Sequence, residues 1–349
     1  MKTKLASIQR IIDIFPIQDD DKIECVKILG WQCVAKKGEF RAGDICVYFE
    51  VDSFLPVKPQ FEFLRDGCFV QNDFMGEGFR LRTKKFRGQV SQGLALPLKT
   101  AGVSLTKEDG AEWIPGDDIT DILGVRKWDM PEVVTGSGKA KGEMPFGIPK
   151  TDETRVQSAP ELIEAFSGVP YYISTKMDGT SVTMYRRNGE FGVCGRNYEY
   201  VDDETCPFWR YAHRQGIREM LEQKQIDNIA IQGEFCGEGI QKNRLKLASP
   251  KWFIFTLIDL NSGKRLGLQA MKDFCASLGL EMVPIEETGA DIPYKSVDAC
   301  IERARGLYDS DEPKEGIVIR PIEPVFNEFL GGPLSMKVIN NDFLLKQKE

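Results

Sequence analysis

The sequence predicts an α+β protein made of two domains, a small β-barrel followed by a larger domain built on antiparallel sheets. The chain has 349 residues, which exceeds the usual length of one domain. Its first third consists of short alternating or β-branched runs separated by turns. In the remainder, strand-like runs follow one another without a regular intervening helix, which disfavours a doubly wound parallel fold.

Residues 1–124 carry the barrel pattern. The strand-like runs are ASIQRIIDIFPI, IECVKILGWQCVAKKG, GDICVYFEVDSFLP, FRLRTKKFRG and SQGLALPL. Glycines stand where hairpins and barrel corners need them, at Gly30, Gly38, Gly43, Gly88 and Gly93. About five strands in this length fit a small Greek-key barrel such as the OB-fold, although the pattern also fits a β-sandwich. We therefore expect an OB-like domain here.

Residues 125–150 differ in composition from what precedes and follows them. The segment WDMPEVVTGSGKAKGEMPFGIPK is rich in Gly, Pro and small polar residues, and it predicts a linker or a flexible loop. The second domain, residues 151–349, contains the strand-like runs YYIST, SVTMYRR, FGVCGRN, IAIQGEF, KWFIFTLIDL, GIVIRP and SMKVI. Helices are expected near residues 204–223, 268–278 and 297–308.

Composition excludes several classes of protein. Hydrophobic residues make up 42% of the chain and charged residues 28%, as in an ordinary globular protein. No apolar run approaches the ~20 residues of a membrane span, and the N-terminal residues lack a secretory signal pattern. Nine cysteines without a C-x-x-C pair argue against a disulfide framework and a zinc site. We expect no membrane partner and a cytoplasmic or other reducing compartment.

The counts of charged groups restrict the chemistry further. His213 is the only histidine, so multi-His metal sites are excluded, and we expect this residue to have a structural role on a solvent-facing helix. The net charge of -7 taken alone argues against a nucleic-acid partner, because neutralising phosphates is the main source of such affinity. A sum conceals how charge is distributed, however, so local clusters have to be considered.

A lysine at the end of an apolar run is the sharpest local feature. Lys176 ends YYISTK, and Asp178 and Gly179 follow it just before a second strand begins. The D-G pair predicts a tight turn from which the lysine amine projects into the neighbouring cleft. Such an amine can attack phosphorus as a covalent nucleophile. A hairpin turn with a solvated lysine has the same pattern, so K-x-D-G needs support from elsewhere in the chain.

Four residues in or beside later strand-like runs supply that support. Glu234 stands at the end of IAIQGEF, Phe255 within KWFIFTLIDL, Glu315 before GIVIRP and Lys337 within SMKVIN. Carboxylates can hold a hydrated magnesium ion, and an aromatic face can stack a purine. A second lysine can neutralise phosphate charge in the transition state. The set is what nucleotide transfer to a lysine requires.

These motifs, in this order, resemble those of the covalent nucleotidyltransferases. KMDG is similar to motif I of that superfamily, GEF to motif III, FIFTLIDL to motif IIIa, EGIVIR to motif IV and SMKVIN to motif V. The match is to ATP-dependent RNA ligases, and it is closest to the type found in Deinococcus and Naegleria, in which an OB domain precedes the catalytic domain. The resemblance therefore implies an OB-like barrel followed by a nucleotidyltransferase domain of ATP-grasp-like ligase fold.

The resemblance also implies roles for the motif residues. Lys176 would become the lysyl-AMP, with Asp178 and Gly179 shaping its turn and Asp178 near the ribose or the metal waters. Glu234 and Glu315 would hold the catalytic metal, Mg²⁺ or Mn²⁺, through its waters.

The same resemblance implies the nucleotide contacts. Phe255 would stack on adenine and Lys337 would contact the α-phosphate. The remaining nucleotide-binding candidates are Lys150, Arg155, Thr175, Gly179 and Arg196. Of these, Lys150 and Arg155 would reach the phosphates, and Arg196 the ribose or the nucleic-acid end.

Two departures from the family pattern are visible. Many ligases have K-x-K in motif V, whereas Lys337 is followed by Val338 and Ile339, so one phosphate contact is missing or comes from elsewhere. Motif IIIa usually has Asp after its Phe, and here the residue is Thr256. Any role of that acid has to be filled differently, while the nucleophile is retained.

Positive charge gathers in two short segments. RLRTKKFRGQ places five cations in eight residues with Phe86 between them and no acid, a mix suited to a groove for a nucleic-acid backbone. The five are Arg80, Arg82, Lys84, Lys85 and Arg87. QKNRLKL adds Lys242, Arg244 and Lys246 in the second domain. Either cluster also fits a solvated strand edge that blocks aggregation.

The sequence thus predicts a monomeric ATP-dependent RNA ligase that joins 3′-OH and 5′-phosphate ends, at nicks in RNA or RNA/DNA duplexes. The reaction would pass through lysyl-AMP and a 5′-adenylated nucleic acid. Alternatives are an inactive OB-containing RNA-binding protein on a ligase scaffold, a DNA ligase or a capping guanylyltransferase.

Overall fold

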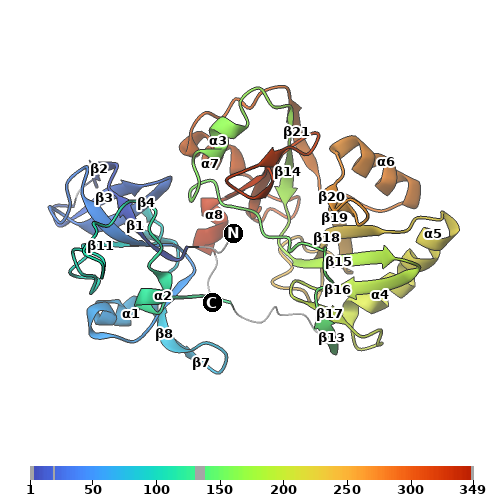
Figure 1. Cartoon of the computed structure of the whole chain (residues 1–349), viewed down its shortest axis with the longest axis horizontal. Coiled ribbons are helices and arrows are strands. Elements are labelled where there is room, and N and C mark those ends of the chain that lie inside the picture. The colour runs from blue at the N-terminus through green and yellow to red at the C-terminus, as the bar shows by residue number, and fades with distance from the viewer. Residues whose placement is uncertain (1–3, 19, 130–137, 347–349) are drawn as a thin grey trace. The chain divides into compact units, whose positions relative to one another are not determined.

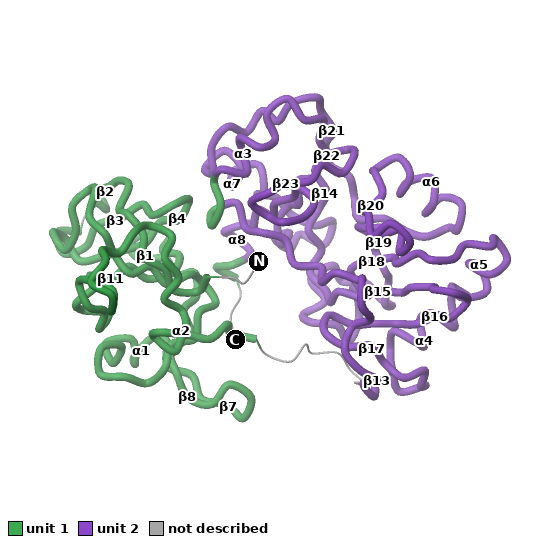
Figure 2. The backbone as a smooth tube through the Cα atoms, viewed as in Figure 1, with its two compact units in different colours: residues 1–131, 157–160, 344–349 green, residues 132–156, 161–343 purple. Residues whose placement is uncertain are grey.

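The computed structural model describes residues 4–18, 20–129 and 138–346, which form two compact units (Figures 1 and 2). The first unit consists of residues 1–131, 157–160 and 344–349, and the second of residues 132–156 and 161–343. Residues 130–137 of the predicted linker lie outside the described residues. The division in space therefore does not follow a single cut in the sequence, and the predicted boundaries at 124 and 150 remain predictions.

The first unit is built from small antiparallel sheets, in the strand orders β1-β5-β11, β2-β3-β4, β12-β6-β8-β7 and β10-β9. The strands are β1 (Ala6–Arg10), β2 (Asp13–Pro16), β3 (Ile23–Ile28), β4 (Trp31–Lys36), β5 (Ile45–Phe49), β6 (Ser53–Leu55), β7 (Phe69–Asn72), β8 (Gly76–Arg80), β9 (Lys84–Phe86), β10 (Gln89–Ser91), β11 (Leu94–Leu96) and β12 (Arg126–Lys127). Short helical segments are η1 (Pro59–Leu64), α1 (Arg65–Cys68) and α2 (Thr120–Leu123).

Strand β5 organises the core of this unit. Successive side chains of a strand point to opposite faces, and both faces of β5 are covered. Val47 and Phe49 pack into one cluster, where the Phe49 ring lies edge-on to Phe61 at 5.6 Å. Tyr48 packs into the other cluster, with its ring 6.4 Å from Trp31. The continuous apolar run ICVYF is thus explained by burial on two sides.

The second unit contains a seven-stranded sheet in the order β13-β17-β16-β15-β18-β19-β20 and a four-stranded sheet in the order β21-β14-β22-β25. A separate two-stranded sheet is formed by β23 (Phe326–Asn327) and β24 (Gly332–Pro333). The strands of the two sheets are β13 (Ala140–Glu143), β14 (Tyr171–Lys176), β15 (Thr180–Arg187), β16 (Glu190–Cys194), β17 (Tyr198–Tyr200), β18 (Ile229–Cys236), β19 (Lys251–Asp259), β20 (Lys264–Arg265), β21 (Ile285–Gly289), β22 (Gly316–Pro321) and β25 (Met336–Ile339). All of these strands pair antiparallel, as the sequence predicts.

Helices cover one face of the seven-stranded sheet. The helices of the unit are α3 (Leu162–Ala165), α4 (Pro207–Gln215), α5 (Ile217–Gln223), α6 (Leu268–Leu278), α7 (Val297–Ala304) and α8 (Asn341–Lys346), whose last residues belong to the first unit. Side chains of α4, α5 and α6 share one buried cluster with β15, β18 and β19. Each large apolar side chain removed from water there contributes about 2 kcal/mol. This packing leaves the strand ends free to carry polar residues.

Three details of the fold differ from the sequence prediction or refine it. The helix expected over residues 204–223 is two helices, because Gly216 adopts a left-handed conformation with φ +62°. Part of the predicted linker forms β13, which pairs with β17. His213 lies on α4 with about half of its side chain exposed, and its Nε2 lies 2.7 Å from Asp202 Oδ1, so it has the structural position that was expected.

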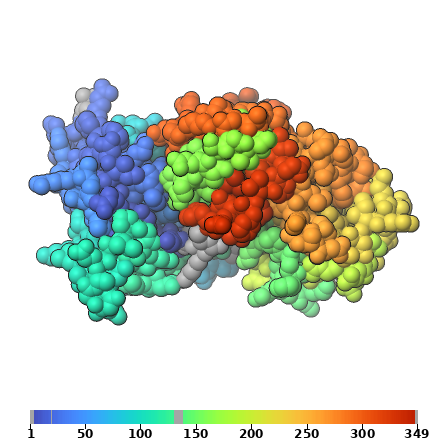
Figure 3. Space-filling view, turned by 45° about the horizontal axis from the view of Figure 1, so that its top comes forward, coloured from blue at the N-terminus to red at the C-terminus, as the bar shows by residue number. Residues whose placement is uncertain are grey.

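The segment that precedes α3 runs against the C-terminal strands, and Figure 3 shows the two lying together at the surface of the molecule. The Val156 N–H donates to the Lys337 carbonyl over 3.0 Å, and the Lys337 N–H donates to Thr154 O over 2.8 Å. In the part of the chain that the structure describes, no helix is both long and apolar enough to cross a membrane.

Candidate active site

The candidate active site forms where the two sheets of the second unit meet. Lys176 is the last residue of β14 in the four-stranded sheet, and four residues later the chain enters β15 of the seven-stranded sheet. The Lys176 Nζ lies 2.7 Å from Oε2 of Glu315, the residue just before β22. Only 24% and 19% of these two side chains are exposed. The predicted nucleophile and one predicted metal-holding carboxylate are therefore in direct contact.

Opposing effects set the pKa of Lys176. Burial removes water from the ammonium group and by itself lowers the pKa. The negative charges of Glu315 and Glu234, with a smaller contribution from Asp178, outweigh burial and raise the pKa above its ordinary value. The side chain is therefore held as a cation, and it must lose a proton before its nitrogen can attack an electrophile. Positive charge placed among these carboxylates would favour that loss.

Gly179 allows the turn after Lys176 to pack directly on β18. A Cβ at this position would overlap the Phe235 carbonyl oxygen and lie 3.0 Å from Glu234 Cγ. Glu234 stands opposite Ser181 in the ladder between β15 and β18. The absence of a side chain at Gly179 therefore brings the turn against the strand that carries Glu234. This is the physical reason for glycine in the D-G pair.

Asp178 is held by an arginine that the sequence had grouped with a basic cluster. Arg244 Nε lies 3.0 Å from Asp178 Oδ2, and only 8% of the arginine side chain is exposed. Burial, followed by the charge of Glu315, raises the pKa of Asp178 to about 6, while Arg244 and Lys176 partly offset the shift. Arg244 also lies 4.7 Å from the centre of the Phe343 ring. It is thus a buried part of the site and contributes nothing to an exposed nucleic-acid surface.

Lys337 and Arg155, predicted separately as phosphate contacts, are backbone neighbours. The two residues form an isolated parallel bridge, and Lys337 stands opposite Val318 in the ladder between β22 and β25. Burial lowers the pKa of Lys337 to about 8, with further contributions from the cations of Arg155 and Lys176. Three cationic side chains therefore repel one another here, which makes the location favourable for an anion.

Phe255 occupies an irregularity of β19. Gln232 pairs with Thr256 while its neighbour Gly233 pairs with Ile254, so Phe255 is the extra residue of a β-bulge. Bulges re-aim a side chain and are common beside active sites. The ring is partly buried against the cluster that contains Met177. The predicted adenine platform thus lies in the same region as the turn that follows Lys176.

Arg320 fixes the backbone at this bulge. Its Nη1 donates to the Phe255 carbonyl and, over 3.2 Å, to Thr256 Oγ1, and its guanidinium carbon lies 5.6 Å from the centre of the Phe255 ring. Its Nη2 lies 2.6 Å from Oε1 of the buried Glu153. Thr256 thus stands where motif IIIa usually has Asp, and the carboxylate that pairs with Arg320 beside it is Glu153, from a distant segment.

The other predicted nucleotide contacts lie in two places. Lys150 Nζ donates to Asn197 Oδ1 over 2.9 Å, and Arg196 Nη2 lies 3.4 Å from Asp152 Oδ1, so these two segments meet. Thr175 precedes Lys176 in β14, and its side chain therefore points to the opposite face of the strand. There its hydroxyl donates to Glu286 Oε1 over 2.7 Å. A nucleotide contact through that hydroxyl remains a prediction.

The carboxylates suit a hydrated ion better than a closed metal cage. Among the described residues, no group of three or more His, Cys, Asp and Glu side chains is arranged to hold a metal ion. Glu234 and Glu315 nevertheless both act on the charge of Lys176, one from each sheet. Mg²⁺ usually keeps several waters and needs only one or two carboxylates from a protein. The residues therefore fit an ion held through its waters.

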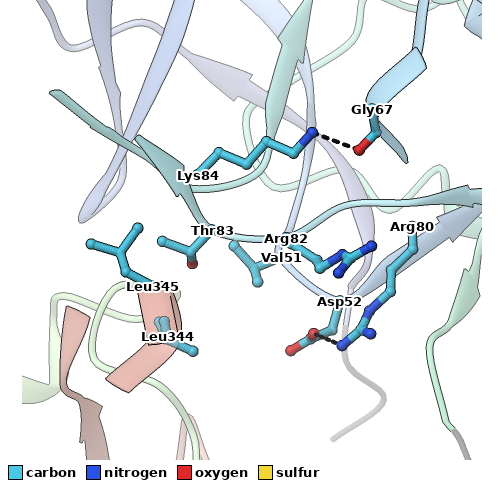
Figure 4. Close-up of a pocket in the computed structure, with 9 residues that line it drawn as sticks. All are labelled: Val51, Asp52, Gly67, Arg80, Arg82, Thr83, Lys84, Leu344 and Leu345. Atoms are coloured by element: carbon cyan, nitrogen blue, oxygen red, sulfur yellow. Dashed lines mark hydrogen bonds and ion pairs between the residues drawn. The ribbon is translucent and has the colours of Figure 1, made fainter. Parts of the chain in front are cut away.

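The predicted basic cluster of the first unit is partly tied up in internal contacts. Arg80 Nη2 lies 3.8 Å from Asp52, Lys84 Nζ donates to Gly67 O over 2.6 Å, and Arg87 Nε lies 3.6 Å from Asp20. Figure 4 shows the first two contacts at a pocket of about 220 Å³ that Arg82 also lines, together with Leu344 and Leu345 of α8. Lys85 and Phe86 are exposed on β9.

An OB-fold domain followed by a nucleotidyltransferase domain defines the class of protein. The OB-fold domain family matches residues 5–98, and the RNA ligase family matches residues 169–339. Solved structures of Naegleria gruberi RNA ligase align with 98% of this chain and 98% of their own, at 34% identity. The TM-score is 0.88 for a lysine variant with ATP and Mn and 0.86 for the ligase with pyrophosphate. No curated protein matches the chain.

The chain belongs to the RNA ligase family. The predicted resemblance, the fold class and the enzyme class of ATP-dependent RNA ligase are thereby confirmed. RNA follows as the substrate class.

A substitution at Gly316 tests how closely the backbones of β22 and β25 pack beside the site. It pairs with Lys176 on one side and Ile339 on the other, its φ is +152°, and a Cβ would overlap the Val338 carbonyl. We expect Gly316→Ala to lower the free energy of unfolding by about 3 to 5 kcal/mol, since strain and overpacking add. Urea unfolding measures the change.

Gly332→Ala is the matched control for that variant. Gly332 lies on β24, and a Cβ there meets no atom within 4 Å. Its stability should stay within about 0.5 kcal/mol of the wild type. If both variants unfold at the same urea concentration, Gly316 is not under the constraint described.

Proposed function

We propose that this RNA ligase uses ATP to join 3′-OH and 5′-phosphate ends at nicks in duplexes, through a lysyl-AMP at Lys176. The observation that carries the proposal is the buried Lys176 amine, 2.7 Å from Glu315 and within the electrostatic influence of Glu234 and Lys337. The Naegleria structures support it, because their ligands are ATP, AMP and pyrophosphate. These correspond to the substrate, the transferred group and the leaving group of lysine adenylylation.

The reaction has three steps. Lys176 Nζ, having lost its proton, forms a bond to the α-phosphorus of ATP while the bond to the β-phosphate oxygen breaks and pyrophosphate leaves. The 5′-phosphate of the nucleic acid then attacks the same phosphorus and releases the lysine. Finally the 3′-OH loses its proton and attacks the phosphorus of the adenylated end, so that AMP leaves and a phosphodiester remains. Positioning and charge stabilisation are the protein's contributions.

The side chains divide this work among them. Lys337 and Arg155 hold the α-phosphate and its neighbours, and Phe255 stacks on the adenine ring. Lys150 and Arg196 contact the outer phosphates and the ribose or nucleic-acid end. Asp178, held by Arg244, faces the ribose or the metal waters. Glu234 and Glu315 hold Mn²⁺ or Mg²⁺ through water, and the ion would neutralise phosphate charge and favour the free amine.

In this proposal, the OB unit binds the duplex. Lys85, Phe86 and Arg87 are the exposed part of the predicted cluster and lie on the hairpin of β9 and β10. A cation can neutralise a backbone phosphate and an exposed ring can stack on a base. Lys84 is the first residue of β9, and Arg80 and Arg82 lie shortly before it in the chain, so we assign these cations to the same surface.

We also propose that the enzyme acts as a monomer in a reducing intracellular compartment. All nine cysteines are unpaired and buried. Free thiols persist where glutathione and thioredoxin keep them reduced.

The covalent intermediate is the first test. Purified protein mixed with ATP and Mn²⁺ should gain the mass of one AMP, and Lys176→Ala should gain none. Intact mass spectrometry measures the adduct, and peptide mapping locates it. Lys224→Ala, an exposed lysine just after α5, is the control and should be adenylylated like the wild type. An adduct on Lys176→Ala, or none on the wild type, would exclude this nucleophile.

The depressed pKa of Lys337 predicts a pH dependence of AMP binding. A lysine with a pKa of about 8 is mostly charged at pH 7 and mostly neutral at pH 9, so its attraction for the α-phosphate is lost as pH rises. Lys176, with its raised pKa, stays charged over that range. We expect AMP to bind up to about tenfold more weakly at pH 9 than at pH 7 without metal.

Calorimetry of AMP binding checks this, and Lys337→Arg is the control. The guanidinium keeps its charge throughout, so the variant should bind AMP with nearly the same affinity at both pH values. A wild-type affinity that does not change between pH 7 and 9 contradicts the role assigned to Lys337.

The exposed residues of the β9–β10 hairpin are expected to affect binding of the nicked duplex without affecting lysine adenylylation. Lys85→Ala combined with Phe86→Ala should weaken binding and sealing of a nicked RNA duplex severalfold, while lysine adenylylation stays at the wild-type rate. Electrophoretic binding and sealing assays measure the effect, with unannealed single strands for comparison. The control pair is Lys99→Ala with Leu105→Ala, two exposed residues of the same unit. Equal sealing by all three proteins would leave the hairpin without a role in substrate binding.

A further inference from the structure

We propose that Tyr308 is a positioning residue that holds Lys176 next to Glu315. This inference rests on the proposed function and adds a residue to it. The Tyr308 hydroxyl donates to the Lys176 carbonyl oxygen over 2.7 Å and accepts from the Glu315 N–H over 3.0 Å. One side-chain oxygen thus joins the backbone of the nucleophile to the backbone of its ion-pair partner. No sequence motif singled this residue out.

The hydroxyl occupies the point at which two strands separate. Lys176 and Gly316 form the last pair in the ladder between β14 and β22. Glu315 is the residue just before β22, and its N–H would otherwise form the next backbone hydrogen bond of this ladder. The Tyr308 hydroxyl bridges the Lys176 C=O and this N–H, so both backbone groups are satisfied without a further strand pair. The hydroxyl therefore fixes the distance between the two backbones at the point where the strands separate.

Tyr308 is itself held firmly. Its ring packs with the buried cluster that contains Met177, Cys236 and Phe253. Its own N–H donates to Glu312 O over 2.8 Å, and its carbonyl accepts from the Asp311 N–H over 3.0 Å, which closes a tight turn. Because the ring is fixed in this way, the Tyr308 hydroxyl can hold the Lys176 carbonyl and the Glu315 N–H in one position.

The same turn also reaches the segment that holds Asp178. Ser310 Oγ donates to Arg244 O over 2.6 Å, and Lys246 Nζ donates to Ser310 O over 2.7 Å. Arg244 in turn lies 3.0 Å from Asp178 and 3.9 Å from Glu312. The turn around Tyr308 therefore gathers the backbone or side-chain partners of Lys176, Asp178 and Glu315. The turn is therefore placed to hold these three residues in position for the reaction of Lys176.

The consequence is specific to the steps in which Lys176 reacts. In-line attack requires the amine to meet the α-phosphorus at a narrow range of angles, and small misplacements cost large factors in rate. Among the described hydrogen bonds and ion pairs, Tyr308 has none with Lys337 or Phe255, and it lies on neither of their strands, so the affinity for ATP should depend little on it. Sealing of an RNA that already carries AMP does not use Lys176 as a nucleophile and should be affected less.

Tyr308→Phe tests the proposal because it keeps the ring and removes only the hydroxyl. We expect the rate of AMP transfer to Lys176 at saturating ATP to fall by about 10- to 100-fold, with the KM for ATP changed less than about threefold. Sealing of pre-adenylated RNA should keep most of its wild-type rate. Rapid-quench adenylylation and a pre-adenylated nick assay measure the two steps separately.

Tyr294→Phe is the matched control. The Tyr294 hydroxyl is likewise a hydrogen-bond donor, to Glu287 Oε2 over 2.8 Å, but has no contact with Lys176 or Glu315 among the described hydrogen bonds. It should leave the ratio of the two rates unchanged. Wild-type adenylylation by Tyr308→Phe overturns the proposal, and so does an equal loss in both steps.

A folding defect is separated from a positioning defect by restoring the donor. Incorporating 4-aminophenylalanine at position 308 places an N–H where the hydroxyl was, and we expect it to recover at least about tenfold of the lost adenylylation rate. A folded protein with no recovery counts against the proposal. If the wild type itself forms no lysine adduct, the proposed function fails and not merely the role of Tyr308.

Discussion

The ion pair between Lys176 and Glu315 is the interaction on which the rest of the site depends. A buried ammonium group is costly unless opposite charge and hydrogen bonds surround it. The carboxylates of Glu315 and Glu234 supply that charge strongly enough to raise the pKa of Lys176 despite its burial. The same carboxylates that stabilise the folded enzyme thus hold its nucleophile in the unreactive protonated form. Chemistry then requires a second cation to compete for them.

Bringing those charges together constrains the backbone more than the side chains. Lys176 and Glu315 belong to the four-stranded sheet and Glu234 to the seven-stranded sheet, so the sheets must approach within side-chain reach. Two glycines make this possible, since a Cβ at Gly179 would strike β18 and one at Gly316 would strike β25. The motif residues are far apart in the sequence, but all of them lie where the two sheets pack against each other. This shared packing explains why the motifs occur together in one chain.

The sequence predicts the residues at strand ends and leaves the connecting loops undetermined. Lys176, Glu234 and Lys337 stand in apolar runs whose β pattern is unambiguous, so their elements could be predicted. Arg244 could not be assigned correctly, because QKNRLKL has the composition of a solvated basic segment and only the fold shows its guanidinium buried against Asp178. Tyr308 stands at the end of the helix expected over residues 297–308, which in the structure ends at Ala304, and Glu153 lies in a segment without periodicity; the partners of both are set by tertiary contacts alone.

Charge distribution explains how an acidic chain can act on RNA. The net charge is -7, yet three cations gather at the predicted phosphate site, where burial, together with the charges of Arg155 and Lys176, lowers the pKa of Lys337 to about 8. In the OB unit, Arg80, Lys84 and Arg87 are already engaged with protein groups. Fewer cations of this cluster than its sequence suggests are therefore available to neutralise phosphates, which reduces the counterion release that it can contribute to affinity. In the proposed reaction, placement of the reacting end in the site and stacking on the exposed Phe86 then carry a larger share of substrate recognition.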